Sequence, residues 1–323
     1  MVTVALAGAS GGLGLTVLRH FAANRGDHNI VLLSRFPQTY WTAQGIDIRT
    51  VDYTSRASVV QALKGVHTVL SLIGGSAEAL RDSQLALIAA AKEAGVQRFA
   101  PSEFAGSGGG YEIDLYAGKG EVWDAVKASG MEHTRFVCGL FMSVFATGTP
   151  KAVTSTGEAE GAKTGEEEAL AGLRPWNFVV NMSAGTADLP GDGSAKVMFT
   201  DMRDVARFTV AALDLESWPE ELYMYGSVMT WSEAVTIVER VQGRKFLVKE
   251  NSADELKAGC EDAGKRFYNQ VRLSLTNGWD VGEHSLNSMF PGIKPVTVES
   301  FVEKWWDGVE LGEPRWEDDK GFM

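Results

Sequence analysis

Short apolar runs alternate with amphipathic stretches through the first hundred residues of the chain. The apolar runs are of strand length and predict buried parallel strands at residues 2–7, 30–33, 46–51, 67–73 and 97–101. The stretches between them carry apolar side chains at helical spacing, and Gly65 and Gly95 follow two of them as helix-ending residues. Four rounds of strand and helix predict an α/β fold with a doubly wound parallel sheet and right-handed crossovers.

The pattern changes after about residue 147, where a stretch rich in Gly, Thr, Ala and Glu (residues 147–172) predicts a surface excursion. Later strands are predicted at 133–137, 176–182, 196–200, 222–228 and 245–248, and later helices at 202–215, 231–241, 253–275 and 296–306. We expect a first domain at 1–146, to which residues 196–228 return with a seventh strand of the main sheet. A smaller α/β lobe is expected at 147–323, and it ends in a loose polar tail, residues 312–323.

Three glycines follow the first strand at a spacing of three, Gly8, Gly11 and Gly14. The first lets the chain turn off the strand, the second leaves room for a pyrophosphate beside the backbone, and the third lets the next helix pack closely on the sheet. The free N–H groups and the positive dipole end of that helix would face the phosphates. The loop predicts a dinucleotide site, and the alternative is a plain tight turn without a ligand.

The end of the second strand indicates which dinucleotide is bound. A free ribose 2′-hydroxyl is usually bound there by an acidic residue, but this chain has Ser34 and Arg35. A guanidinium can pair with a 2′-phosphate and stack on adenine, which favours NADP(H); the alternative is a solvated surface arginine. After the third strand, Asp52 either accepts a hydrogen bond from the adenine amino group or caps a helix that begins near Ser55.

Ligands of a doubly wound sheet bind beyond the carboxyl ends of its strands. The fourth strand ends in Gly74 and Gly75, which would let the backbone lie close to a ribose or nicotinamide; a simple loop is the alternative. The segments that follow the strands are therefore expected around one crevice. The predicted cofactor-binding residues are Gly8, Ser10, Gly11, Gly12, Leu13, Gly14, Ser34, Arg35, Asp52, Ser71, Leu72, Ile73, Ser102, Glu103 and Phe104.

Composition narrows the class of protein. The chain has 323 residues, 45% of them hydrophobic, and its net charge of −12 argues against a nucleic-acid-binding surface. The two cysteines are expected to be reduced core residues, the five histidines lack metal-ligand spacing, and no apolar run is long enough to span a bilayer. No leader is recognised before the first strand. We expect a cytoplasmic monomer or homodimer without a metal, a membrane or a nucleic-acid partner.

The segment Pro101-Ser102-Glu103-Phe104, which follows Arg98-Phe99, resembles a signature of the isoflavone-reductase-like and NmrA-like proteins. These proteins are atypical members of the short-chain dehydrogenase superfamily. The glycine spacing, Arg35 and the stretch Phe199-Thr-Asp-Met-Arg-Asp-Val205 are similar to the same family. The resemblance covers residues 1 to about 250 and implies a Rossmann sheet with a substrate lobe.

The resemblance also implies a catalytic lysine on the helix after the fifth strand, and Lys119 is the candidate. Independently, Leu115, Lys119 and Val122 fall on one helix face, where a buried amine needs partners such as a cofactor ribose and a substrate oxygen. The alternative is a lysine that reaches solvent from a frayed helix start. Tyr116 is only three residues before Lys119, unlike the usual Tyr–Lys pair at a spacing of four, so we expect Tyr116 to be a pocket wall.

Apolar side chains after the sixth strand are candidates for the substrate pocket. The family binds nicotinamide and substrate near this segment, and the residues concerned are Leu140, Phe141, Met142 and Phe145, together with Tyr116. Core packing is the alternative for them. The glycine-rich loop at 104–111 can close over a substrate or be disordered.

These features predict an NADPH-dependent reductase of a small, largely apolar secondary metabolite of aromatic or polyketide-like character. The nicotinamide would supply a hydride, and Lys119 would donate a proton to the developing oxyanion directly or through water. The alternative is a non-catalytic, NADP(H)-sensing regulator that resembles NmrA, keeps the dinucleotide fold and acts by binding a protein.

Overall fold

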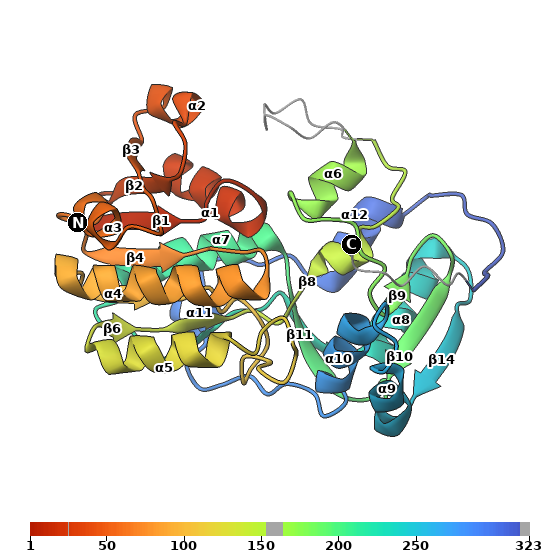
Figure 1. Cartoon of the computed structure of the whole chain (residues 1–323). Helices are drawn as coiled ribbons and strands as arrows, with labels where there is room; N and C mark the ends of the chain where they lie inside the picture. Colours follow the sequence, from red (N-terminus) through yellow and green to blue (C-terminus); the bar gives the residue numbers. More distant parts are fainter. Residues whose placement is uncertain (25, 153–163, 317–323) are drawn as a thin grey trace. The chain divides into compact units, whose positions relative to one another are not determined.

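The computed structural model describes residues 1–24, 26–152 and 164–316. The chain divides into two compact units, each assembled from separate stretches of sequence (Figure 1). The first unit contains Met1–Val137, Val205–Met224 and Gly282–Ile293. The second contains Cys138–Asp204, Tyr225–Val281 and Lys294–Met323. The division falls after Val137 and not at residue 146, and of residues 196–228 only Val205–Met224 belong to the first unit.

A parallel sheet forms the centre of the first unit. Among the described residues, six strands pair in the order β3-β2-β1-β4-β5-β6, all parallel. They are β1 (Thr3–Ala7), β2 (Asn29–Ser34), β3 (Asp47–Thr50), β4 (Thr68–Ser71), β5 (Arg98–Ala100) and β6 (Glu132–His133). The strand order reverses beside β1, so the predicted doubly wound α/β fold is confirmed, with its switch point between the neighbouring strands β1 and β4.

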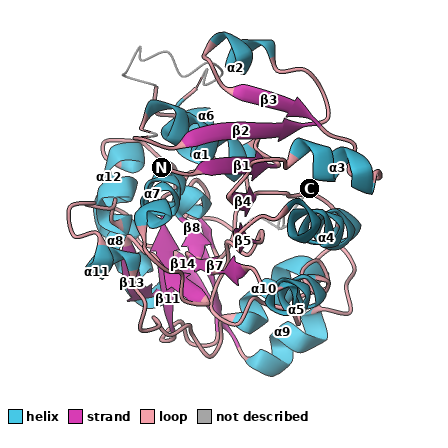
Figure 2. Ribbon diagram, turned by 90° about the vertical axis from the view of Figure 1, so that its left-hand side faces the viewer, coloured by secondary structure: helices cyan, strands magenta, loops and turns pink. Residues whose placement is uncertain are grey.

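Helices cover both faces of this sheet (Figure 2). One face carries α3 (Arg56–Ala62), α4 (Gln84–Ala94) and α5 (Lys119–Ser129), which contact one another in that order. The other face carries α1 (Gly12–Ala23) and α7 (Met202–Ala211). Apolar side chains of α3, α4 and α5 pack on the strands as one buried cluster. Smaller elements of this unit are α2 (Thr39–Ala43), η3 (Ala212–Asp214) and α11 (Leu286–Met289).

Two predicted strands divide where the chain changes partner. The strand expected at 133–137 is split between β6, in the main sheet, and β7 (Arg135–Val137), which pairs with β12 (Glu221–Tyr223). The strand expected at 222–228 is split into β12 and β13 (Ser227–Thr230), so it does not join the main sheet. The split follows the hydrogen bonds, because Met224 N–H donates to Val137 and Gly226 N–H donates to Phe199.

In the described part of the second unit there are two small sheets. In one, β11 (Lys196–Thr200) lies between β8 (Leu140–Phe141) and β13. In the other, β10 (Thr186–Pro190) lies between β9 (Val180–Asn181) and β14 (Leu247–Asn251). The helical elements are η2 (Met142–Phe145), α6 (Gly165–Leu170), α8 (Trp231–Gln242), α9 (Ala253–Gly259), α10 (Arg266–Ser274) and α12 (Val298–Trp306).

Several predicted boundaries of this part were wrong. The strand predicted at 176–182 is confined to β9, and the helix predicted at 253–275 is interrupted between α9 and α10, where residues 260–265 form turns. The helix predicted at 202–215 ends as α7 and continues as a 3₁₀ turn. Residues 153–163 of the predicted surface excursion and residues 317–323 of the predicted tail lie outside the described residues.

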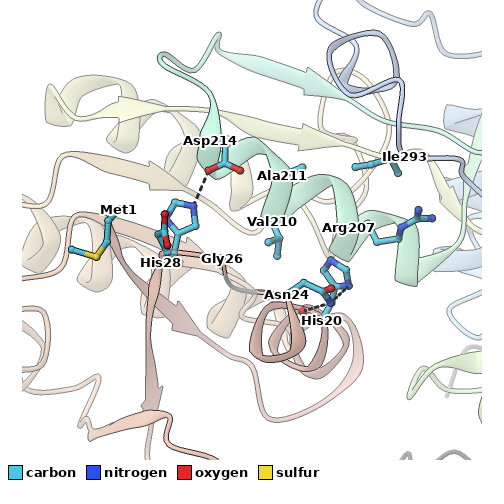
Figure 3. A pocket seen from close by; sticks show the side chains of 11 residues that line it. Met1, His20, Asn24, Gly26, His28, Arg207, Val210, Ala211, Asp214 and Ile293 are labelled. Carbon is cyan, nitrogen blue, oxygen red and sulfur yellow. Dashed lines mark hydrogen bonds and ion pairs between the residues drawn. The ribbon is translucent and has the colours of Figure 1, made fainter.

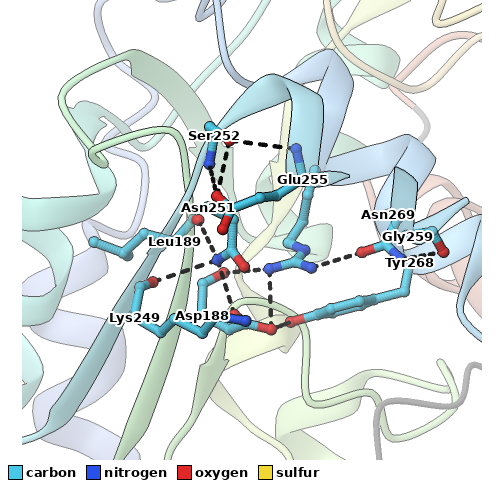
Figure 4. A network of polar contacts seen from close by, with 10 residues as sticks. Asp188, Leu189, Lys249, Asn251, Ser252, Glu255, Gly259, Tyr268 and Asn269 are labelled. Atoms are coloured by element: carbon cyan, nitrogen blue, oxygen red, sulfur yellow. Dashed lines mark hydrogen bonds and ion pairs between the residues drawn. The ribbon is translucent and has the colours of Figure 1, made fainter. Parts of the chain in front are cut away.

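Polar side chains tie the second unit together inside its core (Figure 4). Asp188 on β10 forms an ion pair with Arg272 at 2.9 Å and accepts hydrogen bonds from Tyr268 at 3.1 Å and Asn251 at 2.9 Å. The four side chains join β10, β14 and α10, and all are nearly inaccessible to solvent. A buried carboxylate is tolerated when it is paired and hydrogen-bonded in this way.

The last described helix is held by its tryptophans. The indole N–H of Trp306 donates to the Phe145 carbonyl at 2.6 Å, and the Thr149 hydroxyl donates to the Trp305 carbonyl at 2.6 Å. Both tryptophan side chains are buried within the second unit. The pair is therefore part of that unit's core.

Candidate active site

The glycines after β1 have three different surroundings. Gly8 has a positive φ of 83°, and a Cβ there would lie 2.6 Å from the Ile73 backbone nitrogen. A Cβ on Gly14 would overlap the Gly8 carbonyl oxygen and lie 2.7 Å from Ala9 Cα. A Cβ on Gly11 would meet no described atom within 4 Å. Gly8 is thus required by close packing on the segment after β4, and Gly14 by the close packing of α1 on Gly8 and Ala9, whereas the space beside Gly11 is open.

This open space lies at the start of α1. Gly11 is the N-cap residue, and among the described residues no side chain caps the helix and no acidic residue lies in its first turn. The N–H groups of Gly12, Leu13 and Gly14 therefore belong to a helix end that carries positive potential without a protein anion. Ser10 and Gly11 are exposed beside it. These residues fit a dinucleotide pyrophosphate, which needs close backbone approach and N–H donors.

Arg35 lies directly after β2, at the same sheet edge as the glycine loop, because β1 and β2 pair in parallel from Thr3 to Ala7. Its side chain is exposed, with the guanidinium carbon 5.9 Å from the centre of the Phe36 ring. The Ser34 hydroxyl donates to the Phe36 carbonyl at 2.7 Å and so shapes the turn that presents Arg35. An exposed guanidinium at this edge fits a 2′-phosphate.

Asp52 does not cap the following helix. The cap of α3 is Ser55, which accepts from the Ser58 N–H, whereas Asp52 accepts from the backbone and hydroxyl of Thr54 at 2.9 and 2.7 Å. These hydrogen bonds from Thr54 lower the pKa of Asp52. The helix-cap interpretation was therefore wrong, and the adenine contact stays a prediction.

The ends of β4 and β5 lie at the same edge of the sheet as the glycine loop, because these strands run parallel to β1. Ser71 ends β4 with a buried hydroxyl that has no hydrogen-bond partner among the described residues, and Leu72 and Ile73 follow it, both buried. After β5, the Ser102 N–H donates to the side chain of Gln84 at 2.7 Å. Gln84 is fully buried and also donates to the Leu80 carbonyl at 2.6 Å, so it fixes the segment after β5.

A helical irregularity puts Gln84 in place. The helical stretch that Gly95 was predicted to end contains a π-helical turn, η1 (Ala79–Ser83), before α4 begins at Gln84. Such turns are rare and often lie near functional sites. The sequence signal for Gln84 was a polar residue at a core position of an apolar helical face.

Lys119 is the first residue of α5 and is buried, with only 5% of its surface exposed. Its Nζ lies 4.8 Å from the centre of the Tyr116 ring. This distance permits a cation–π contact, so Tyr116 forms a wall beside the amine. Burial raises the pKa of the Tyr116 hydroxyl, which favours its neutral form.

Glu103 is the most deeply buried acidic side chain near Lys119, with 1% of its surface exposed. Neither carboxyl oxygen has a hydrogen-bond partner among the described residues. Burial raises the pKa of Glu103 to about 7, against the opposing effects of Lys119 and then Arg135. Because the carboxyl group is covered, a cofactor contact predicted for Glu103 would involve its backbone. Phe104 follows it and stacks on Phe136, 5.4 Å between ring centres.

Arg135 and its partners were not predicted from the sequence. The Arg135 guanidinium forms an ion pair with Glu221 on β12, donates to the Tyr111 hydroxyl at 3.1 Å and lies over the Trp123 ring. Burial, and then the nearby Glu103, raise the pKa of Tyr111 to about 12. A half-buried arginine inside a short strand was the available signal, but its partner is 86 residues away in the chain.

The apolar residues predicted for the substrate pocket lie in the second unit. Leu140 and Phe141 form β8 and are half-buried. Met142 and Phe145 are fully buried, and the Phe145 ring lies 5.4 Å from that of Phe199 and 6.1 Å from that of Trp231. Met142 and Phe145 therefore have the surroundings of core residues, whereas Leu140 and Phe141 keep exposed surface.

A separate hollow of about 450 Å³ in the first unit has no residue of the glycine loop in its lining (Figure 3). It is lined from α1, the start of β2, α7 and η3, and in it His28 pairs with Asp214 at 3.0 Å. Met1 and His28 precede β1 and β2, so the hollow is at the amino ends of the strands. A doubly wound sheet binds its cofactor at the opposite ends, and this hollow is not part of the candidate site.

The part of the chain that the structure describes contains no helix long and apolar enough to cross a membrane. Within the same residues there is no group of three or more His, Cys, Asp or Glu side chains placed to hold a metal ion.

The sheet order, the glycine loop and the segment after β5 define a Rossmann-type protein of the kind that the sequence resembles. The profile of the NmrA-like family matches residues 2–277. The chain belongs to the NmrA-like family, as its motifs predicted.

Relatives at moderate identity are named as oxidoreductases or reductases. Oxidoreductase BOA1 of Botryotinia fuckeliana (strain B05.10) is 27% identical over 325 residues, covering 94% of this chain and 98% of the relative. Pinoresinol reductase 2 of Arabidopsis thaliana is 27% identical over 271 residues, covering 78% of each chain.

Solved structures share the fold. The complex of leucoanthocyanidin reductase with NADPH from Vitis vinifera matches with a TM-score of 0.70 at 20% identity, covering 94% of this chain and 99% of that one. Isoflavone reductase matches with a TM-score of 0.70 at 15% identity, covering 94% and 98%.

Proposed function

We propose that this protein is an NADPH-dependent reductase of a small, largely apolar molecule of aromatic or polyketide-like character, with Lys119 as the proton donor. The observation that carries the proposal is the buried Lys119 amine at the start of α5, in a unit whose glycine loop fits a dinucleotide. A lysine is rarely buried without a task or a partner, because removing an ammonium from water is costly.

The cofactor assignment rests on residues of the first unit. The open space beside Gly11 and the uncapped start of α1 would accept the pyrophosphate, and Arg35 would accept the 2′-phosphate. When bound, the nicotinamide would supply the hydride. The solved leucoanthocyanidin reductase structure is a complex with NADPH, and this supports the same choice here.

The role of Lys119 follows from its charge and position. An ammonium group can donate a proton to an oxyanion that develops on the substrate. Before the proton is transferred, the positive charge of the ammonium stabilises the developing oxyanion. The Tyr116 ring limits the directions in which the amine can move. Gln84 and the π-helical turn hold the neighbouring segment after β5 in place.

The substrate class is inferred from apolar surface and from relatives. Leu140 and Phe141 keep exposed apolar surface, which suits a largely apolar ligand. The relatives named pinoresinol reductase act, by their names, on an aromatic compound. We extend this chemical class, and no particular compound, to the present chain.

The Lys119→Met variant tests the proposal. We would screen aromatic ketones, enones and quinones with the wild-type protein by following NADPH absorbance, and then measure both proteins on any substrate found. Turnover should fall by roughly 10²-fold or more, the usual contribution of a positioned acid. NADPH affinity by calorimetry should stay within a few-fold, because the proposed phosphate contacts involve other residues.

Unchanged turnover in Lys119→Met would exclude Lys119 as the acid. Tight NADPH binding with no turnover across the whole panel would favour a cofactor-sensing regulator instead. The Lys127→Met variant, on an exposed turn of the same helix, is the matched control and should behave as wild type.

A further inference from the structure

Lys119 lies between two glycines at the start of α5. Gly118 is the N-cap residue, and Gly120 is the second residue of the helix. Glycine has no side chain to pack and costs more conformational entropy to fix than any other residue, so this helix end is not made rigid by its own sequence. A proton donor needs a fixed geometry toward its acceptor, so the first turn of α5 has to be held by other segments.

One of these glycines is contacted by Arg81 of η1. A Cβ on Gly118 would lie 2.9 Å from the Cβ of Arg81. The Arg81 guanidinium pairs with Glu121 at 2.7 Å and with Asp82 at 2.5 Å, and all three side chains are exposed. Exposed ion pairs stabilise a structure only weakly. Arg81 therefore gives α5 a surface contact and not a firm support.

The other glycine is contacted by Tyr111, from the glycine-rich loop that precedes α5. A Cβ on Gly120 would lie 3.4 Å from Cδ2 of Tyr111 and 3.7 Å from its Cγ, so the ring packs on the helix backbone next to Lys119. Tyr111 also packs against the buried apolar cluster of the first unit. Its ring therefore joins the first turn of α5 to the core of this unit.

The backbone of the loop lies against the same ring. Gly108, Gly109 and Gly110 have successive positive φ values of 80°, 77° and 64°, a conformation that residues with a side chain rarely adopt. A Cβ on Gly109 would overlap the Tyr111 ring, whereas a Cβ on Gly108 would meet no described atom within 4 Å. The close approach of loop and ring thus requires glycine at position 109.

Arg135 on β7 holds the hydroxyl end of the ring. Its Nη1 donates to the Tyr111 hydroxyl at 3.1 Å, and its guanidinium carbon lies 5.1 Å from the centre of the Trp123 ring on α5. The same guanidinium forms an ion pair with Glu221 of β12, and the Arg135 side chain is only 14% exposed. Breaking a largely buried pair is costly, so Arg135 is a fixed support that contacts α5 directly and through Tyr111.

We propose that Tyr111 is a positioning residue for Lys119. Its ring packs on Gly120 and holds the first turn of α5, and with it the amine, at a fixed place. Gly109 and Arg135 in turn fix the ring. This proposal rests on the proposed function only for the catalytic use of Lys119, and the positioning itself can be tested without a substrate.

The position of the Lys119 amine can be followed in the ligand-free protein by NMR of lysine labelled with ¹³C at Cε. The signal of Lys119 is the one that is missing in Lys119→Met. Its chemical shift depends on burial and on the Tyr116 ring, whose centre lies 4.8 Å from Nζ. A displaced first turn should therefore move the signal toward the position that exposed lysines share.

Gly109→Ala and Gly108→Ala form a matched pair of variants. Both place a methyl group at a positive φ, so both strain the loop backbone to a similar extent, but only the methyl group at 109 overlaps the Tyr111 ring. We expect the Lys119 signal to move in Gly109→Ala and to keep its wild-type position in Gly108→Ala. An unmoved signal in Gly109→Ala, or equal movement in the two variants, would overturn the proposal.

Substitutions of Tyr111 itself decide the question even if Gly109→Ala fails to fold. Tyr111→Leu keeps apolar bulk but removes the ring from Gly120 and the hydroxyl from Arg135, whereas Tyr111→Phe keeps the ring. The Lys119 signal should move in Tyr111→Leu, and Tyr111→Phe should recover most of the wild-type position. A wild-type position in Tyr111→Leu would contradict the role of the ring and overturn the proposal.

Turnover supplies the second readout. Tyr111→Leu should lower kcat by roughly tenfold or more, because misplacement of a catalytic group by about 1 Å can cost up to about 10²-fold. The KM for NADPH should stay within a few-fold, since the proposed phosphate contacts involve other residues. Tyr111→Phe should recover most of the rate, and Gly108→Ala should turn over at the wild-type rate. If Lys119→Met has lost turnover, a wild-type kcat in Tyr111→Leu would overturn the proposal.

The two proposals can fail separately. A moved Lys119 signal in Gly109→Ala, with full turnover in Lys119→Met, would remove the catalytic role of Lys119 and keep its positioning by Tyr111. Lost turnover in Lys119→Met, with an unmoved Lys119 signal in Gly109→Ala and Tyr111→Leu, would keep the proposed function and remove the role of Tyr111.

Discussion

Substitutions of Gly14 and Gly11, in the loop after β1, should distinguish a glycine needed for packing from a glycine needed for ligand binding. Gly14→Ala places a methyl group against the Gly8 carbonyl and Ala9, whereas Gly11→Ala places it in open space on an extended backbone with φ of −167°. We expect Gly14→Ala to lower the free energy of unfolding by about 1–3 kcal/mol through overpacking. Gly11→Ala should leave stability within about 0.5 kcal/mol yet weaken NADPH binding.

Chemical denaturation and calorimetry check this pair of variants. Equal stability of the two proteins would contradict the packing role of Gly14. NADPH binding that is unchanged in Gly11→Ala would contradict a pyrophosphate beside residue 11.

Arg35 should determine cofactor choice. A charged, multiply hydrogen-bonded 2′-phosphate contact favours NADPH over NADH by about 2 kcal/mol or more. Arg35→Ala should remove most of that preference, which titration calorimetry with both cofactors would measure. Equal dissociation constants for NADPH and NADH in the wild type would show that Arg35 is only a solvated surface residue.

At the scale of residues, the sequence was sufficient to find candidate site residues whose position depends only on nearby residues of the chain. The glycines and Arg35 follow strands directly, so a spacing rule is enough to find them. Gln84 and Arg135 depend on partners distant in the chain, and the buried state of Glu103 depends on how the segment after β5 is covered. No spacing rule carries that information, because burial and pKa arise from tertiary contacts.

At the scale of elements, the Asp188 network should be sensitive to loss of one partner. Arg272→Met would leave the buried Asp188 with only its neutral partners Tyr268 and Asn251. Removing one member of a buried ion pair costs about 3–5 kcal/mol. Arg240→Met, which breaks an exposed pair with Glu299, should cost less than about 1 kcal/mol.

Unfolding in guanidinium chloride, followed by tryptophan fluorescence, measures the free energy of unfolding of both variants. Trp176 is a suitable probe because it lies in the same unit, with its ring centre 6.4 Å from that of Tyr268. Similar losses for Arg272→Met and Arg240→Met would mean that the network adds no more than a surface pair.

The predicted strands were wrong where the chain passes from one sheet to another. The strands of the central sheet were found because buried parallel strands are short and apolar. The predicted strands at 133–137 and 222–228 were each one apolar run, yet each divides between two partners. Apolar character is the same on both sides of the division, so the sequence pattern cannot locate it.

At the scale of the whole molecule, Glu103 should make stability depend on pH. Its pKa is about 7 when folded and near 4.5 when unfolded, so the folded protein binds the proton more strongly. Stability is therefore expected to fall as pH rises from 4.5 to 7. At about 1.4 kcal/mol per pKa unit, the loss from this group reaches up to about 3 kcal/mol.

Urea unfolding at pH 5 and pH 7.5 would measure this loss in wild type and Glu103→Gln. The variant should show a smaller decrease over the same interval, because it has no carboxyl to ionise. Parallel decreases in the two proteins would mean that Glu103 titrates alike in the folded and unfolded chain.

The first unit is completed by segments that are translated late. The strand β7 pairs with β12, which is formed by residues 221–223. The N–H of Tyr223 in β12 in turn donates to the carbonyl of His284. During synthesis, the edge of β7 that pairs with β12 stays unpaired until residues 221–223 have left the ribosome. Unpaired strand edges can pair with other chains. Synthesis must therefore proceed through His284 before the first unit can close, although its glycine loop is made much earlier than this residue.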